Sequence, residues 1–206
     1  MKKIINPWKG LEGYNCFGCA PNNEAGVKME FYEDGDEVVS IWKPRPEYQG
    51  WIDTLHGGIQ AVLMDEICAW VVLRKLQTTG VTSKMETRYR KSVDTKDSHI
   101  VLRASIKEVK RNIVIVEAKL YNKDGEVCTE SVCTYFTFSK EKSKDKMHFT
   151  KCDVEPEEIL PLILNKNSSF CDKCLVVSNK CFTFVAVNKR NMKYTTTHHH
   201  HHFPNE

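Results

Sequence analysis

The sequence contains no run of about 18 uncharged apolar residues, the length that a membrane-spanning helix requires. The N-terminal stretch MKKIINPWKG has two lysines but no apolar segment of about 7 to 15 residues behind them, so it does not resemble a signal peptide. We therefore expect a cytoplasmic protein that has no membrane partner.

The chain also lacks a strong excess of charge of either sign. Its formal net charge is +3, but residues 161–206 hold six basic and two acidic residues, which leaves −1 for residues 1–160. Proteins that bind nucleic acid through its phosphates carry a clear basic excess. No helix-turn-helix pattern is visible either, and we expect no nucleic-acid partner.

A disulfide framework is not indicated, because the nine cysteines are odd in number and irregularly spaced. Cys16 and Cys19 form one C-x2-C pair, and Cys171 and Cys174 form another. Together they suggest a four-cysteine zinc site, but the 151 intervening residues lie far outside the usual ligand spacing. We favour reduced Cys16 and Cys19 in a turn that covers a pocket, and expect no metal and no cofactor.

What the chain does contain is enough apolar sequence for one well-buried domain, with 206 residues of which 41% are hydrophobic. Residues 27–33 and 37–42 alternate in polarity around the turn DGD and predict an antiparallel hairpin. The turn NKDG at 122–125 predicts a second hairpin. Four strands are expected after residue 80, at 81–91, 98–108, 112–121 and 126–138.

Between these two groups of strands, apolar residues recur at spacings of three and four within the segment DTLHGGIQAVLMDEICAWVVLRK, residues 53–75. They predict a helix of about 16 to 18 residues that is apolar on nearly every face. Such a helix must be enclosed, so we expect an α+β fold in which an antiparallel sheet wraps a long central helix. Residues 1–145 would form this domain. Residues 146–206 would be an extension without a stable fold, unless His198–His202 make it a metal-binding tail.

The element order β-β-α-β-β-β-β, with LHGG opening the helix and an acid nine positions after His56, resembles the hotdog-fold acyl-CoA thioesterases of the phenylacetate-pathway type. The segment NCFGCAPNNEAGVKMEF, residues 15–31, also looks like the N-terminal stretch of many bacterial members. The resemblance covers about residues 10–140. It implies hydrolysis of an acyl-CoA substrate at a site built across the interface of a homodimer or a dimer of dimers.

Thioester hydrolysis needs a carboxylate that activates water or attacks directly, and donors that hold the oxyanion. The resemblance selects Asp65 over its neighbour Glu66, for which a hydrogen bond or a salt bridge would be a structural role. Gly57 and Gly58 at the helix start offer backbone N–H groups without a Cβ to block a substrate carbonyl. His56 either shapes this turn or hydrogen-bonds near the substrate.

Asp65 lies eight residues beyond Gly57, or about 12 Å along a helix axis, too far for both to touch one carbonyl. Two helices packed antiparallel about a two-fold axis would bring Gly57 of one chain near Asp65 of the other. The spacing and the resemblance therefore agree on a dimeric site, in which Asp65 is either nucleophile or general base.

Further residues follow from the resemblance. Thr82 stands where related enzymes place a Ser or Thr near the attacking water, although Ser83 is adjacent. Some relatives have Asn six residues before the histidine; here that position is Gly50, and Gln49 is the candidate substitute. The phosphates of coenzyme A make contacts with three basic residues plausible, namely Arg88, Arg90 and Lys91.

Other functions stay open alongside hydrolysis. A hotdog module that binds acyl-CoA without catalysis is the main alternative, because one fold hosts several chemistries. Hotdog hydratases and dehydratases fit less well, since their characteristic placement of His with Asp or Glu is absent. The acyl pocket is expected to be lined from two subunits, by residues such as Trp51, Met64 and Trp70.

Overall fold

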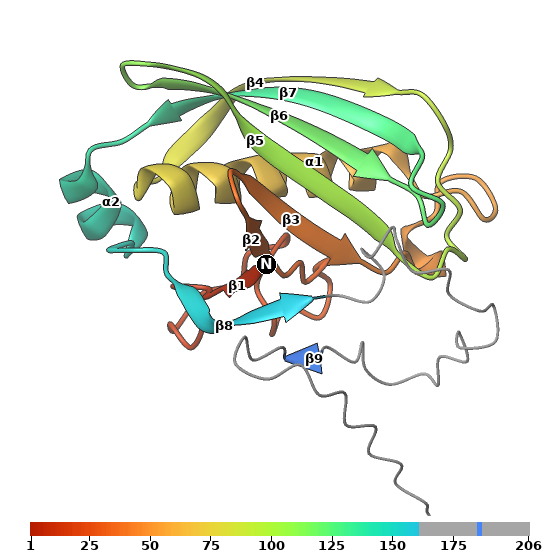
Figure 1. Cartoon of the computed structure of the whole chain (residues 1–206), viewed down its shortest axis with the longest axis horizontal. Coiled ribbons are helices and arrows are strands. Elements are labelled where there is room, and N and C mark those ends of the chain that lie inside the picture. The colour runs from red at the N-terminus through yellow and green to blue at the C-terminus, as the bar shows by residue number, and fades with distance from the viewer. Residues whose placement is uncertain (161–184, 187–206) are drawn as a thin grey trace, which may run out of the picture. The chain divides into compact units, whose positions relative to one another are not determined.

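A computed structural model of the chain describes residues 1–160 and 185–186 (Figure 1). The chain divides into two units, Met1–Pro156 and Glu157–Glu206. The elements of the first unit are β1 (Lys2–Ile4), β2 (Tyr32–Asp34), β3 (Glu37–Trp42), a 3₁₀ turn (Pro46–Tyr48), α1 (Gly57–Val71) with a π-helical turn (Val72–Leu76), β4 (Gly80–Tyr89), β5 (Ile100–Lys110), β6 (Ile113–Tyr121), β7 (Val127–Thr137) and α2 (Lys140–Met147). The next strand, β8 (Val154–Leu160), begins in the first unit and ends in the second, where its last two residues pair with β9 (Val185–Ala186).

In the first unit the strands form one antiparallel sheet in the order β4-β7-β6-β5-β3-β2-β1. Figure 1 shows β4 to β7 arching over α1, which contacts every strand from β3 to β7. The helix is enclosed as its apolar faces predict: Leu63, Met64, Ile67 and Cys68 have no solvent exposure. The predicted α+β arrangement, a sheet wrapped around a central helix, is confirmed.

The predicted N-terminal hairpin is shorter than expected. β3 agrees with the prediction, but only Tyr32–Asp34 pair with it as β2, whereas the sequence pattern placed a strand over 27–33. Val27 and Met29 donate their backbone N–H groups to the carbonyls of Phe17 and Gly18 instead. The backbone here therefore pairs with the N-terminal turn and does not form a strand of the sheet.

α2 and β1 were not predicted. β1 has three residues, too few for an alternating pattern, and α2 (KEKSKDKM) has almost no apolar side chain. α2 begins at a capping residue, Ser139, whose Oγ accepts the Lys142 N–H at 3.2 Å. No helix in the described part of the chain is long and apolar enough to cross a membrane.

One buried hydroxyl attaches α2 to the start of β4. Ser143 has no solvent exposure, and its Oγ lies 2.7 Å from Thr79 Oγ1, 3.0 Å from Thr78 Oγ1 and 3.1 Å from Thr79 N. Ser143→Ala leaves the Thr79 N–H without an acceptor, and we expect the free energy of unfolding to fall by about 1–3 kcal/mol. Urea denaturation measures this loss, with Ser92→Ala on the exposed surface as the control. An unchanged midpoint would contradict the role of Ser143.

Candidate active site

Asp65 lies in the third turn of α1, where its carboxylate meets side chains from β4 and β7. Its Oδ1 accepts a hydrogen bond from Thr82 Oγ1 at 2.8 Å and another from the Tyr135 hydroxyl at 2.7 Å. The same hydroxyl lies 2.8 Å from the Asp65 backbone carbonyl. No described residue donates to Oδ2. The carboxylate is thus fixed in orientation by one oxygen while the second oxygen stays available.

Tyr135, Asp65 and Thr82 differ in solvent exposure. Tyr135 is buried, and this desolvation raises the pKa of its phenol well above the usual range, so the hydroxyl remains a donor. Asp65 is half-buried and Thr82 is exposed. Because β4 is the last strand of the sheet on this side, the Asp65–Thr82 pair stands at an open sheet edge.

The start of α1 forms the second part of the site. His56 is the N-cap, and its Nδ1 accepts the Gly58 N–H at 2.8 Å. Its ring therefore shapes the turn, which is the structural role that the sequence left open. The Gly57 N–H, in contrast, has no acceptor among the described residues, and the Tyr89 hydroxyl donates to the Gly57 carbonyl at 2.8 Å. This contact places the end of β4 beside the helix start.

Gly50 has a steric reason for differing from the asparagine of some relatives. A Cβ at this position would lie 3.3 Å from His56 Cδ2, closer than most Cβ contacts. The neighbouring Gln49 uses its Oε1 to accept the Asp53 N–H at 3.2 Å, within the turn that leads to α1. Gln49 is therefore placed near the helix start, with its carbonyl oxygen already bonded.

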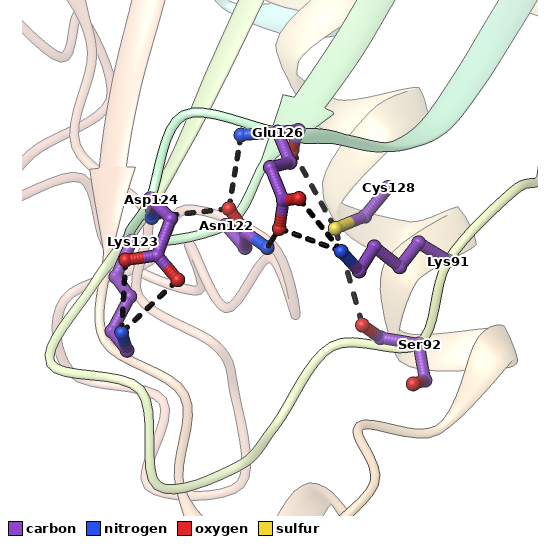
Figure 2. A network of polar contacts seen from close by, with 7 residues as sticks. All are labelled: Lys91, Ser92, Asn122, Lys123, Asp124, Glu126 and Cys128. Carbon is purple, nitrogen blue, oxygen red and sulfur yellow. Dashed lines mark hydrogen bonds and ion pairs between the residues drawn. The ribbon is translucent and has the colours of Figure 1, made fainter.

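The three basic candidates lie at or just after the end of β4. Lys91 Nζ lies 2.7 Å from both carboxylate oxygens of Glu126, which also accepts a bond from Asn122 Nδ2 (Figure 2). Arg90 pairs with Glu130 on β7. No ion pair is recorded for Arg88 among the described residues. These cations are exposed, and water and salt screen surface ion pairs of this kind, so the pairs add little to stability.

Glu66 points away from Asp65. Its Oε1 accepts the Trp70 Nε1–H at 3.1 Å, so of the two structural roles predicted for it the hydrogen bond is confirmed. No basic side chain pairs with it in the part of the chain that the structure describes. Burial, followed by the nearby Cys16 sulfur, raises the pKa of the Glu66 carboxyl to about 7.

The predicted pocket residues are not brought together. Trp51 is 84% exposed, whereas Met64 and Trp70 are buried in the core, where Trp70 stacks on Phe31 with ring centroids 4.5 Å apart. Because the expected acyl pocket combines residues of two subunits, the burial of Met64 and Trp70 in the single chain leaves that expectation a prediction. A helix that is apolar on every face gives no sign of which face meets the core.

Comparisons with known proteins find a similar family and similar folds. Residues 53–129 match the model of the family described as the thioesterase superfamily. The fold is similar to that of another thioesterase superfamily protein (TM-score 0.54, 20% identity, 59% of this chain and 62% of that one). The chain thus spans less than two thirds of the length of that relative. A search of curated protein sequences gave no match.

Two further solved structures have the same fold. One is a thioesterase from Streptococcus pneumoniae solved with coenzyme A (TM-score 0.50, 22% identity, 54% of this chain and 86% of that one). The other is a Streptococcus mutans protein bound to acetyl-CoA (TM-score 0.52, 16% identity, 64% and 98%). Over residues 53–129 the chain is thus similar to the thioesterase superfamily. Its sheet and central helix are the hotdog fold of that superfamily, while membership of the phenylacetate-pathway type stays a prediction.

The candidate site includes one residue that the sequence did not indicate. Tyr135 lies 70 positions after Asp65, in strand β7. The alternation of this strand does not distinguish Tyr135 from its other inward-facing residues. A buried tyrosine usually gives its hydroxyl a partner, but the identity of that partner depends on the packing of β7 against α1. Only the three-dimensional arrangement shows that the partner is Asp65.

Proposed function

We propose that this protein hydrolyses acyl-CoA thioesters to the free acid and coenzyme A, with Asp65 as the catalytic carboxylate. The observation that carries the proposal is the arrangement of that carboxylate. Its Oδ1 is held by Thr82 and Tyr135, and its Oδ2 has no partner among the described residues. The match to the thioesterase superfamily model supports thioesterase chemistry, and the similar streptococcal structures with coenzyme A and acetyl-CoA support this substrate class.

Asp65 can act either as a general base or as a nucleophile. As a general base, Oδ2 takes a proton from water, the hydroxide attacks the thioester carbonyl, and the C–S bond breaks as the proton passes to the leaving thiolate. As a nucleophile, Oδ2 attacks the carbonyl itself and expels the thiolate, and water then hydrolyses the mixed anhydride. In both routes Thr82 and Tyr135 hold the carboxylate in place. After a single turnover in ¹⁸O-water, ¹⁸O in Asp65 would establish the nucleophilic route, with water attacking the Asp65 carbonyl of the anhydride.

The oxyanion of either route needs donors, and the helix start offers one. The Gly57 N–H has no acceptor among the described residues and stands at the positive end of the helix dipole. His56 and Gly58 assist by fixing the turn through their mutual hydrogen bond. Gln49, in the preceding turn, is the candidate for an additional substrate contact.

Because the Gly57 N–H and Asp65 stand about 12 Å apart on one helix, we propose that each site combines Gly57 of one subunit with Asp65 of its partner. The sheet edge at β4 supports this arrangement. The edge strand β4 carries exposed apolar side chains at Val81 and Tyr89, and Phe136 is exposed beside it on β7. A two-fold axis at this edge would cover these side chains. The oligomer is then a homodimer or a dimer of dimers, and light scattering during gel filtration measures its mass.

Arg88, Arg90 and Lys91 are proposed contacts for the phosphates of coenzyme A. They follow the Asp65–Thr82 pair along β4 toward Tyr89, whose hydroxyl meets the Gly57 carbonyl. A bound substrate would then have its thioester near Asp65 and its phosphates near this basic end of the strand.

Release of free thiol from short, medium, long and aryl acyl-CoAs tests the proposed function. We expect the wild-type protein to turn over at least one of these classes. Binding of an acyl-CoA without hydrolysis of any would instead establish a binding module. Absence of both binding and hydrolysis would overturn the proposal altogether.

Tyr135→Phe tests how the carboxylate is held. The change keeps the buried ring and removes one donor to Asp65 Oδ1, and a hydrogen bond to a charged group contributes about 1.5 kcal/mol or more. We expect kcat to fall roughly tenfold, with little change in KM. Tyr121→Phe is the matched control, because Tyr121 is half-buried in the adjacent strand β6 and its hydroxyl bonds to no other residue that the structure describes. Equal rates for Tyr135→Phe and the wild type would remove Tyr135 from the site.

A further inference from the structure

Three potential metal ligands meet where the N-terminal turn crosses α1. The sulfur atoms of Cys16 and Cys19 and a carboxylate oxygen of Glu66 all lie within 4.8 Å of one another. Cys16 Sγ lies 3.7 Å from Glu66 Oε1 and 3.9 Å from Oε2. Cys19 is buried and Cys16 is half-buried. The cluster joins residues 50 positions apart, so the fold, and not the local sequence, assembles it.

The backbone between the two cysteines is shaped to admit the carboxylate. A Cβ at Gly18 would lie 2.3 Å from both Cδ and Oε2 of Glu66, a distance that no side chain tolerates. Glycine at this position therefore lets the C-x2-C turn close directly around Glu66. The turn itself is held by the Ala20 N–H, which donates to the Cys16 carbonyl at 3.1 Å.

The cluster offers three ligand atoms for a cation and has no positively charged side chain of its own. Glu66 receives a hydrogen bond from Trp70 Nε1, and no Lys, Arg or His side chain in the described part of the chain forms an ion pair with it. A carboxylate buried beside two thiols is costly unless a positive charge compensates it, and a cation bound by all three groups would do so.

The spacing of the donors matches one kind of ion. Zn²⁺ binds cysteine sulfur at about 2.3 Å and carboxylate oxygen at about 2.0–2.2 Å. A tetrahedral angle between these bonds separates sulfur from oxygen by about 3.6 Å, close to the 3.7 Å between Cys16 Sγ and Glu66 Oε1. Two thiolates favour a thiophilic ion over Mg²⁺ or Ca²⁺.

We propose that Cys16, Cys19 and Glu66 bind one thiophilic divalent cation, with Zn²⁺ as the best fit and a water molecule in the fourth position. Binding releases the two thiol protons to solvent and forms two Zn–S bonds and one Zn–O bond. The separation of 151 residues makes a zinc site shared with Cys171 and Cys174 unfavourable. The present site needs neither of them, because Glu66 supplies the third ligand.

The ion would have a structural role. Glu66 points toward the cysteines while Asp65, the next residue, points toward Thr82 and Tyr135, so the ion would not touch the catalytic carboxylate. It would instead tie the N-terminal turn to the helix that carries Asp65. The proposal therefore stands or falls independently of acyl-CoA hydrolysis.

Cobalt substitution tests the site, because Co²⁺ bound to thiolate gives charge-transfer absorption that oxygen and nitrogen ligands do not. The probe is Co²⁺ added to the reduced, chelator-treated full-length chain. Cys171, Cys174 and Cys181 are changed to Ser and His198–His202 to Ala, so that they contribute no signal. We expect one Co²⁺ per chain with thiolate charge-transfer bands, and displacement by Zn²⁺ with loss of the bands.

Variants assign the ligands. Cys16→Ser and Cys19→Ser should each weaken the charge-transfer bands, and Glu66→Gln should keep them but lower the affinity about tenfold or more. Cys128→Ser is the control, since that buried cysteine lies outside the cluster. Bands that are absent, or that persist unchanged in both serine variants, would overturn the proposal.

A second measurement needs no substitution and is unaffected if a variant fails to fold. Zn²⁺ should slow the alkylation of Cys16 in the unaltered full-length chain, as followed by peptide mass spectrometry. Alkylation at an unchanged rate, or a Cys16–Cys19 disulfide that forms equally fast with and without Zn²⁺, would refute the site.

Discussion

Replacing Asp65 by Asn should lower kcat for acyl-CoA hydrolysis by about a hundredfold or more while the protein keeps its fold and oligomeric state. Asparagine has nearly the same shape, and its Oδ1 can still accept from Thr82 and Tyr135. The group at the Oδ2 position becomes an amide, which can neither take a proton from water nor attack a carbonyl. The chemical step is lost, but the packing that holds the side chain is not.

Two comparisons make this result specific to Asp65. Asp36→Asn, in the turn between β2 and β3, removes a carboxylate far along the chain from the site and should leave the rate unchanged. Glu66→Gln alters the adjacent residue of the same helix, and its effect on kcat should be smaller than that of Asp65→Asn. A rate for Asp65→Asn within tenfold of the wild type would refute the catalytic role of Asp65. In that case Asp65 would have a structural role, as the acceptor for the buried Tyr135 hydroxyl.

The large elements could be predicted because each follows from a local pattern. The long strands match the expected segments to within two residues at nearly every end, and α1 with its π-helical turn covers Gly57–Leu76. Alternation and helical spacing are properties of neighbouring residues, so one sequence is enough to show them. The elements that were missed lack such a pattern. α2 is polar throughout, and its single buried side chain, Ser143, depends on Thr78 and Thr79 some 64 positions away.

In the candidate site, too, some residues could be predicted from the sequence and others could not. A resemblance in the order and spacing of residues pointed to Asp65, Gly57 and Thr82, and the contact between Thr82 and Asp65 agrees with it. Tyr135 could not be foreseen, because nothing in a strand's alternation tells which distant carboxylate a tyrosine will meet. The same holds for the approach of Cys16 to Glu66. Contacts between residues far apart in sequence depend on packing, which local periodicity does not encode.

Gly57→Pro should abolish most of the hydrolysis by removing a single backbone donor. Proline is well tolerated at the first position of a helix, and the backbone of His56 (φ −58°, ψ 133°) is the extended form that precedes proline. The change deletes the Gly57 N–H, and loss of one oxyanion donor lowers kcat by about 10²–10³. Gly57→Ala is the matched control, because both variants add a Cβ and only proline removes the N–H, so the difference in kcat between them measures the donor. It keeps the N–H, and its Cβ would lie an ordinary 3.5 Å from the Tyr89 ring.

Combining this variant with Asp65→Asn tests whether the two parts of the site come from different subunits. If each site uses Gly57 of one chain and Asp65 of its partner, a heterodimer of the two inactive variants contains one intact site and one doubly altered site. Random mixing of subunits makes half of the dimers heterodimers, so the refolded mixture should regain about 25% of wild-type activity. A site contained within one subunit predicts no recovery at all, because every chain then carries one of the two defects. Recovery would therefore establish that the dimer is part of the catalytic machinery, since neither variant holds both groups in one chain.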